Sequence, residues 1–153
     1  MRLLSMKAEW LIAQGKRHNA MELYEKLLRL HPDDAIGARL PLQVLYLEFK
    51  EYDKFIELQE RFSDGFSVHH HYNYALYLYM VQAGEDELDE AMDEAIEFNP
   101  YVLPYLQGKK KIKDQYLTRY NPKDESGATV YCVDALYLWH QQYGIQKWLK
   151  KFS

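Results

Sequence analysis

The stretch MRLLSMKAEWLIAQGKRHNAMELYEKLLRLHPDD, residues 1–34, decides the fold class. Apolar residues recur at helical spacing on both sides of Gly15, and Pro32 follows the second run. Glycine is favoured just past a helix C-terminus, and proline cannot continue a helix, so the stretch is interpreted as one helical hairpin. A hairpin that buries one face of each helix needs neighbours, which predicts an array. The two faces are marked by Leu3, Leu4, Ala8, Leu11 and Ile12 and by Ala20, Leu23, Tyr24, Leu27 and Leu28.

The same periodicity continues along the chain and predicts a single all-α domain. Asp33 and Asp34 stand where they can cap the next helix. Pro41 places the start of that helix near Leu40, because an interior proline removes a hydrogen bond and clashes. The predicted domain covers residues 1–153, with hairpins at about 1–32, 33–64 and 67–100 and an irregular helical cap over 101–153. Within the cap we expect helices over about 102–110, 124–142 and 144–152 and a loop over about 111–122.

The composition is that of an ordinary globular protein. The chain has 153 residues, of which 48% are hydrophobic and 27% charged, and a net charge of −4, which argues against a general nucleic-acid binder. Cys132 is the single cysteine, which excludes an intramolecular disulfide and fits a reducing cytoplasm. No run approaches the roughly 18 apolar residues of a membrane span, and the N-terminus lacks a signal-peptide core. We therefore expect a cytoplasmic protein without membrane contact.

The hairpins resemble tetratricopeptide repeats. This resemblance implies a right-handed superhelix of antiparallel hairpins, whose first helices line a concave face. The second hairpin departs from the pattern, because Gln43 and Phe55 occupy sites for small residues. In the first hairpin the pattern falls on Leu4, Ala8, Leu11, Gly15, Ala20, Tyr24, Leu27 and Pro32, and in the third on Leu88, Met92, Ala95 and Pro100.

The region from His31 to Phe152 is also similar to bacterial repeat proteins related to the suppression-of-tumorigenicity-seven family. The segment Asn99-Pro100-Tyr101-Val102-Leu103-Pro104-Tyr105-Leu106-Gln107-Gly108-Lys109 carries most of this likeness, since it is no part of a generic repeat. A late aromatic cluster adds Tyr131, Trp139 and Trp148, and the two tryptophans are expected to cap the open apolar end of the array. The resemblance implies an interaction role and carries no catalytic residue over.

Two residue groups suggest chemistry, and both have simpler interpretations. His69-His70-His71 resembles a zinc signal, but neighbouring residues on a helix point about 100° apart, which favours a structural or surface role. Cys132 and His140 lie two turns apart, roughly 12 Å, too far for proton transfer. We therefore expect Cys132 in the core, and neither a metal nor a cofactor.

Two charged runs of opposite sign lie in the second half of the chain, over residues 85–97 and 109–123. Each is interpreted as a solvated surface, with cation binding by the acidic run and anion or nucleic-acid binding by the basic run as the alternatives. Together they suggest weak head-to-tail self-association. The acidic run is Glu85, Asp86, Glu87, Asp89, Glu90, Asp93, Glu94 and Glu97, and the basic run is Lys109, Lys110, Lys111, Lys113, Arg119 and Lys123.

The tyrosine-rich segment Tyr72 to Tyr79 is the best candidate for a binding surface, because Tyr and Met are good anchors for a peptide. Its tyrosines cannot all face one side, and packing of some of them in the core is the simpler interpretation. The resemblance places its first-helix residues on the concave face. Ser5 and Glu9 occupy the sites where repeats that hold acidic chaperone tails need Lys and Asn, so we do not expect that ligand. The predicted peptide groove consists of Glu9, Ile12, Val44, Leu47, Glu48, Tyr72, Leu76, Tyr79 and Met80.

The sequence therefore predicts a non-catalytic scaffold or adaptor that binds a protein or peptide. An enzyme is not expected, because no phosphate-binding glycine loop, catalytic carboxylate pair or nucleophile motif is present. The alternative is that the chain is the C-terminal part or a subunit of a larger assembly whose basic loop binds nucleic acid or anions. Upstream repeats would fit onto the first hairpin without distortion.

Overall fold

The computed structural model describes residues 2–63, 66–113 and 120–152. Over these ranges the protein is built of helices and turns without a strand, which confirms the predicted all-α class. The chain forms two compact units, Met1–Phe62 and Ser63–Ser153. They are called unit 1 and unit 2 below, and each is described by itself.

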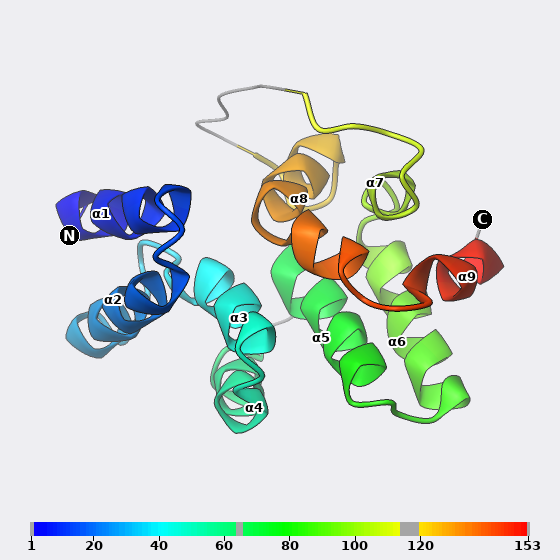
Figure 1. Cartoon of the computed structure of the whole chain (residues 1–153), viewed down its shortest axis with the longest axis horizontal. Helices are drawn as coiled ribbons and strands as arrows, with labels where there is room; N and C mark the ends of the chain where they lie inside the picture. The colour runs from blue at the N-terminus through cyan, green and yellow to red at the C-terminus, as the bar shows by residue number, and fades with distance from the viewer. Residues whose placement is uncertain (1, 64–65, 114–119, 153) are drawn as a thin grey trace. The chain divides into compact units, whose positions relative to one another are not determined.

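Unit 1 contains two helical hairpins that lie within the ranges expected for the first two (Figure 1). α1 packs against α2, α2 against α3, and α3 against α4, so α2 and α3 each touch two neighbours. The four helices are α1 (Arg2–Ala13), α2 (Arg17–Leu30), α3 (Arg39–Glu48) and α4 (Tyr52–Arg61).

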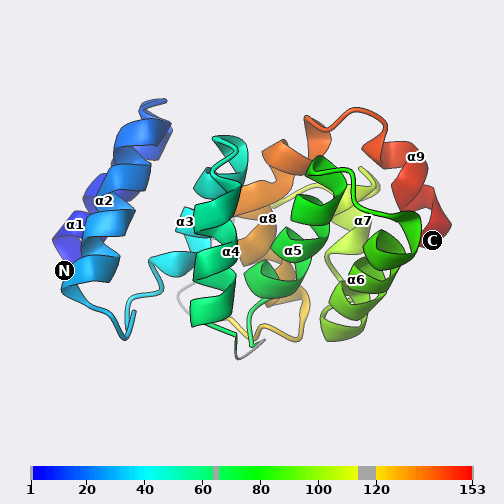
Figure 2. The ribbon, with the colours of Figure 1, turned by 90° about the horizontal axis from the view of Figure 1, so that it is seen from below.

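Unit 2 contains the third hairpin and the C-terminal helices. α5 lies between α6 and α8 and packs against both (Figures 1 and 2). The short α7 contacts α8, and α9 leads into the final 3-10 turn. Residues 114–119 of the expected loop lie outside the described residues. The elements are α5 (Val68–Met80), α6 (Glu85–Phe98), α7 (Leu103–Leu106), α8 (Glu125–His140), α9 (Ile145–Leu149) and η1 (Lys150–Phe152).

The three hairpins share one turn. After α1, α3 and α5 the chain places Gly15, Lys50 and Gln82 in the left-handed region, with φ of 76°, 57° and 59°. In each case this residue and the next donate backbone hydrogen bonds to the last helical turn, which satisfies carbonyls that the helix end leaves open. The matching donor–acceptor pairs are Gly15–Ile12 and Lys16–Leu11, Lys50–Leu47 and Glu51–Tyr46, and Gln82–Tyr79 and Ala83–Leu78.

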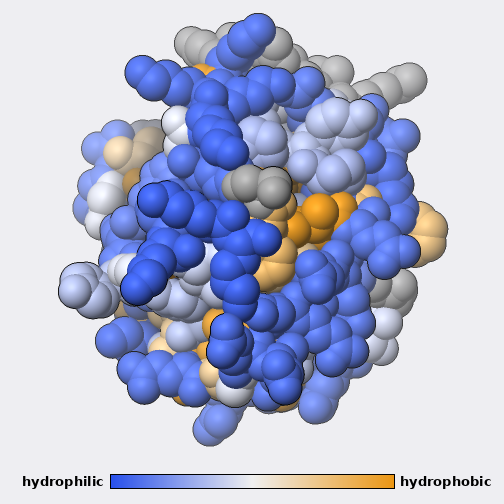
Figure 3. Space-filling model, turned by 90° about the vertical axis from the view of Figure 1, so that its right-hand side faces the viewer, coloured by the Kyte–Doolittle hydropathy of each residue, from blue (hydrophilic) through white to orange (hydrophobic). Residues whose placement is uncertain are grey.

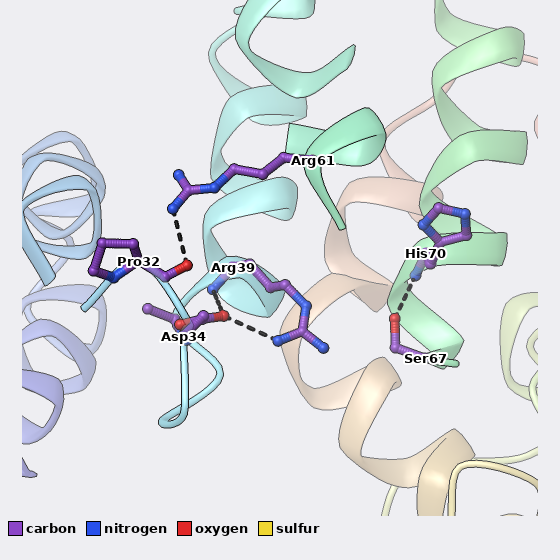
Figure 4. A network of polar contacts seen from close by, with 7 residues as sticks. Pro32, Asp34, Arg39, Arg61, Ser67 and His70 are labelled. Carbon is purple, nitrogen blue, oxygen red and sulfur yellow. Dashed lines mark hydrogen bonds and ion pairs between the residues drawn. The ribbon is translucent and has the colours of Figure 1, made fainter. Parts of the chain in front are cut away.

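The start of α3 depends on Asp34, which is buried and also has a positive φ of 52°. Its carboxylate accepts hydrogen bonds from the backbone N–H of Ala38 at 2.7 Å and of Arg39 at 3.0 Å. The Arg39 guanidinium donates a third at 3.1 Å, and Arg61 of α4 donates to the carbonyl of Pro32 at 3.0 Å (Figure 4). Asp34 therefore caps this helix, as expected.

Pro41 lies in the first turn of α3, which begins at Arg39. Backbone N–H groups in a first helical turn have no partner within the helix, so proline costs little there. The predicted start near Leu40 is confirmed.

Candidate functional site

The predicted groove residues divide into two groups by exposure. Side chains of the first group are at least partly exposed, and those of the second are buried within their own unit. The first group is Glu9, Ile12, Glu48, Tyr79 and Met80. The second is Val44, Leu47, Tyr72 and Leu76. The turns place Glu9, Val44 and Leu76 at equivalent positions of the three hairpins, but the groove itself stays a prediction.

Tyr72 is buried because α8 packs on α5 at this point. Its ring centroid lies 5.7 Å from that of Tyr131 and 6.4 Å from that of Trp139. Its hydroxyl donates a 2.5 Å hydrogen bond to the carbonyl of Asn99. Burial raises the pKa of the Tyr72 phenol, so this hydroxyl stays a donor. Tyr72 thus joins three helices of unit 2.

Two of the more exposed groove residues also have partners. Glu48 accepts a 2.7 Å hydrogen bond from the Arg17 guanidinium, which ties α3 to α2. The hydroxyl of Tyr79 donates to the carbonyl of Tyr143 at 2.5 Å, and its ring stacks on Trp148 at 5.4 Å between centroids. Both side chains therefore help to hold their own unit together.

The interface between α5 and α8 contains a buried polar network. The Tyr131 hydroxyl donates to Asn73 Oδ1 at 2.8 Å and accepts from Trp139 Nε1 at 2.9 Å. His69 Nε2 lies 2.8 Å from Asp134 Oδ2, and its ring meets Tyr131 edge-on. Buried polar groups need such partners, because leaving one unpaired costs about 1–3 kcal/mol.

His69 of the histidine triplet therefore has a structural role. The described ranges contain no group of three or more His, Cys, Asp or Glu side chains placed to hold a metal ion. Cys132 is buried as expected, and burial raises the pKa of its thiol to about 12. His140 Nε2 lies 3.3 Å from the Leu106 carbonyl. The expected core location of Cys132 is confirmed.

Asn99 connects the motif that stood out in the sequence to the start of α8. Its side-chain Nδ2 donates to the carbonyls of Pro122 and Asp124, both at 2.9 Å. Its Oδ1 accepts from the backbone N–H of Tyr101 at 2.9 Å. The side chain is fully buried. Asn99 therefore holds the end of α6 against the start of α8 and has a structural role in unit 2.

The C-terminal helices are held on α6 by a cluster that we call the C-terminal clasp: Glu85, Asp89, Trp148 and Lys151. Trp148 Nε1 donates to Asp89 Oδ1 at 2.9 Å. Lys151 Nζ lies 2.5 Å from Asp89 Oδ2 and 2.9 Å from Glu85 Oε1. Part of the acidic run is therefore paired within the chain. The face of unit 2 that carries α9 is mostly hydrophilic, with a small apolar area near its centre (Figure 3).

The clasp predicts a pH dependence. The hydrogen bond from Lys151, and then that from Trp148, lowers the pKa of Asp89 below its ordinary 3.8. Because the pKa of Asp89 is lower in the folded state, the ionised carboxylate stabilises the clasp at pH values above its ordinary pKa. This stabilisation is lost as the pH falls through the lowered pKa. In an NMR titration, the indole N–H resonance of Trp148 should keep its position until the pH is below 3.8.

Lys151→Met should move the midpoint of that titration up toward 3.8, whereas Lys147→Met, at an exposed lysine of α9, should leave it unchanged. Equal midpoints in the wild-type chain and Lys151→Met would contradict the assignment.

In the described part of the basic run, Lys109, Lys110 and Lys123 have interactions within the chain. Lys110 forms an ion pair with Glu125, and Lys123 Nζ lies 3.9 Å from the centre of the Phe98 ring. Lys111 and Lys113 are exposed, and Arg119 lies outside the described residues. Anion or nucleic-acid binding by this segment stays a prediction.

The outer face of α1 carries exposed apolar side chains that the sequence did not single out. Leu3, Met6 and Trp10 are 80%, 55% and 54% exposed, and Ala13 is exposed as well. These four residues are called the α1 stripe. The expectation that Leu3 belongs to the buried face was wrong. Ala8 and Leu11 are buried and form that face. At 100° per residue, Ala8 lies about 140° around the helix from Leu3 and Leu11 about 80°.

None of the described helices is both long enough and apolar enough to cross a membrane. Fold and surfaces together define an all-α protein built of repeated antiparallel hairpins. Residues 3–152 match the family described as "Transcriptional repressor TCF25", and the chain belongs to that family. No curated protein and no solved structure matches the chain.

Proposed function

We propose that this chain is a non-catalytic, protein-binding module of a transcriptional repressor. The match to the repressor family over residues 3–152 carries the proposal. A repressor must hold other proteins or the template. A net charge of −4 disfavours broad contact with nucleic acid, so we favour proteins.

The shared turn supports a finer description of the fold, a right-handed superhelix like that of tetratricopeptide repeats. Three hairpins end their first helix in the same left-handed turn, with the same pair of backbone hydrogen bonds. Equal turns give each hairpin the same internal register. Stacked hairpins of one register build extended surfaces, which suits protein binding.

The reactive side chains of unit 2 support a role without catalysis. The Cys132 thiol has a pKa of about 12, which keeps it from forming the nucleophilic thiolate. His69 and Tyr131 are buried and engaged with Asp134 and Asn73. These groups stabilise the core in place of acting on a substrate.

The binding surface proposed here includes the accessible groove positions of unit 1, Glu9 and Ile12, whose counterparts Val44 and Leu47 are buried. We further propose that the chain acts where transcription takes place. In a eukaryotic cell this is the nucleus, and only in a bacterium would it be the cytoplasm expected from the sequence.

A reporter assay tests the proposal. The chain is fused to a sequence-specific DNA-binding domain and recruited upstream of a reporter gene. We expect the fusion to lower reporter output several-fold relative to the DNA-binding domain alone. A destabilised variant such as Trp139→Ala, which empties a fully buried site, should lose the effect. A folded fusion that leaves reporter output unchanged would overturn the proposal.

A further inference from the structure

The α1 stripe has the spacing of a helix-binding seam. Leu3, Met6, Trp10 and Ala13 follow one another at intervals of three, four and three residues, as a and d residues do in a coiled coil. Ala8 and Leu11 on the other side of α1 are buried. A helix that is apolar on nearly all sides is normally covered on all sides, and α1 leaves one side exposed.

The repeat shows what covers this side in the next hairpin. Gly15 and Lys50 occupy the same position of the shared turn, so residues counted back from them are equivalent. Trp10 then corresponds to Leu45, and Leu3 corresponds to Ala38. Leu45 is 1% exposed and Ala38 is 3% exposed. The face that is exposed on α1 is therefore buried on α3 at the counterparts of Leu3 and Trp10, and half-buried at Pro41 and Glu48, the counterparts of Met6 and Ala13.

Helix α2 closes that face of α3. Contacts between α2 and α3 lie on both edges of the face that holds Leu45. On one edge Arg17 donates to Glu48 at 2.7 Å, and on the other the Tyr46 hydroxyl donates to Glu25 at 2.7 Å. His18 also meets the ring of Phe49 edge-on at 5.5 Å. The equivalent of the α1 stripe is thus occupied by an amphipathic helix.

The charges along the α1 stripe match those of such a helix. Ala13 is the counterpart of Glu48. Glu9 lies one helical turn before Ala13, on the same edge, and is exposed. Lys7 lies one turn before Leu11, the counterpart of Tyr46, and is exposed too. A helix with a basic residue on the first edge and an acidic residue on the second, as α2 has in Arg17 and Glu25, fits both edges.

We propose that the α1 stripe binds an amphipathic helix of a partner protein, with a surface like that of α2. This inference rests on the proposed protein-binding function and names its site and the chemistry of its partner. The helix presents apolar side chains to Leu3, Met6 and Trp10, places a basic group near Glu9 and an acidic group near Lys7, and covers the stripe as α2 covers α3.

A helical peptide derived from α2 tests this directly. The probe is residues 16–31 with a hydrocarbon staple on its outer face. Met21 and Leu28 are buried and share the helix side of Arg17 and Glu25 by their spacing, so the control probe carries Met21→Asp and Leu28→Asp. Binding to the full chain is measured by calorimetry. We expect micromolar binding that Trp10→Asp weakens at least tenfold.

Val133→Asp is the matched control, because Val133 is an exposed apolar residue of α8, 65% exposed. It should leave the affinity unchanged, and the control probe should not bind. Met6→Asp gives a second variant, and circular dichroism verifies that each variant is folded. Equal affinities for the wild-type chain and Trp10→Asp, or no binding at all, would overturn the inference.

Two other results would also overturn it. Dimerisation in sedimentation experiments that Trp10→Asp abolishes would assign the α1 stripe to a second copy of the chain. Binding to neutral phosphatidylcholine vesicles that Trp10→Asp abolishes would assign it to a lipid surface. The probe assay does not depend on transcription. If the probe does not bind but the reporter assay still shows repression, only the proposed helix site is overturned. Probe binding without repression overturns only the proposed function.

Discussion

Asn99→Ala is expected to lower the free energy of unfolding by about 3 kcal/mol, since it removes three hydrogen bonds at a fully buried site. The carbonyls of Pro122 and Asp124 would lose their donor, and the N–H of Tyr101 would lose its acceptor. Chemical denaturation measures the loss directly. In a thermal melt it corresponds to a fall of about 10 °C in Tm for a chain of this size.

The matched control is Asn121→Ala. Asn121 is exposed and its side chain accepts one hydrogen bond, from the N–H of Lys123 at 2.8 Å. Removing that bond from an exposed position should cost less than about 1 kcal/mol. If the two variants are equally stable, Asn99 does not hold the start of α8 in place.

Gly127→Ala should destabilise unit 2 by about 2–3 kcal/mol, although alanine is normally the better helix residue. Gly127 lies in the first turn of α8 and is buried. A Cβ atom there would lie 2.5 Å from the Asn121 carbonyl oxygen and 2.8 Å from Pro122 Cα. Both contacts are with backbone, and the Pro122 carbonyl is held by Asn99, so the neighbours cannot move away cheaply. Urea denaturation gives the magnitude.

Gly84→Ala is the control for this prediction. Gly84 precedes α6 with a negative φ, and a Cβ atom there would meet nothing within 4 Å. The free energy of unfolding of the Gly84→Ala variant should stay within about 1 kcal/mol of the wild-type value. A Gly127→Ala chain as stable as Gly84→Ala would mean that α8 does not pack closely on residues 121 and 122.

Much of the helical framework could be predicted from the sequence, because burial of one helix face imposes a period of 3.6 residues. Gly15 and Pro32 mark the helix ends of the first hairpin, because glycine is favoured just past a helix C-terminus and proline cannot continue a helix. The turns after α3 and α5 were harder to read, since Lys50 and Gln82 take the left-handed conformation that usually signals glycine. Their equivalence to Gly15 is visible only in the backbone.

The role of the motif around Asn99 could not be read from the sequence. Its partners Pro122 and Asp124 lie more than twenty residues further along, beyond any local pattern. The predicted groove includes Tyr72 because the resemblance places first-helix residues on the concave face, and the sequence does not show that this side chain is buried. Its burial depends on Tyr131 and Trp139 of α8, whose position follows from tertiary packing.

The α1 stripe was missed for a different reason. Leu3, Leu4, Met6, Ala8, Trp10 and Leu11 cover more than half of the circumference of α1, so periodicity alone does not tell which side is buried. Leu3 was assigned to the wrong side as a result. Comparison with α3, through the shared turn, identified both the exposed side and the kind of helix that covers it.

The most direct test of the account compares two variants in the reporter assay, Trp10→Asp and Val133→Asp. Each puts a carboxylate in place of an exposed apolar side chain, one in the α1 stripe and the other on α8. If the α1 stripe holds the partner helix of a repressor module, Trp10→Asp loses repression at equal protein level and Val133→Asp keeps it. Full repression by Trp10→Asp, or equal loss in both variants, would contradict the account.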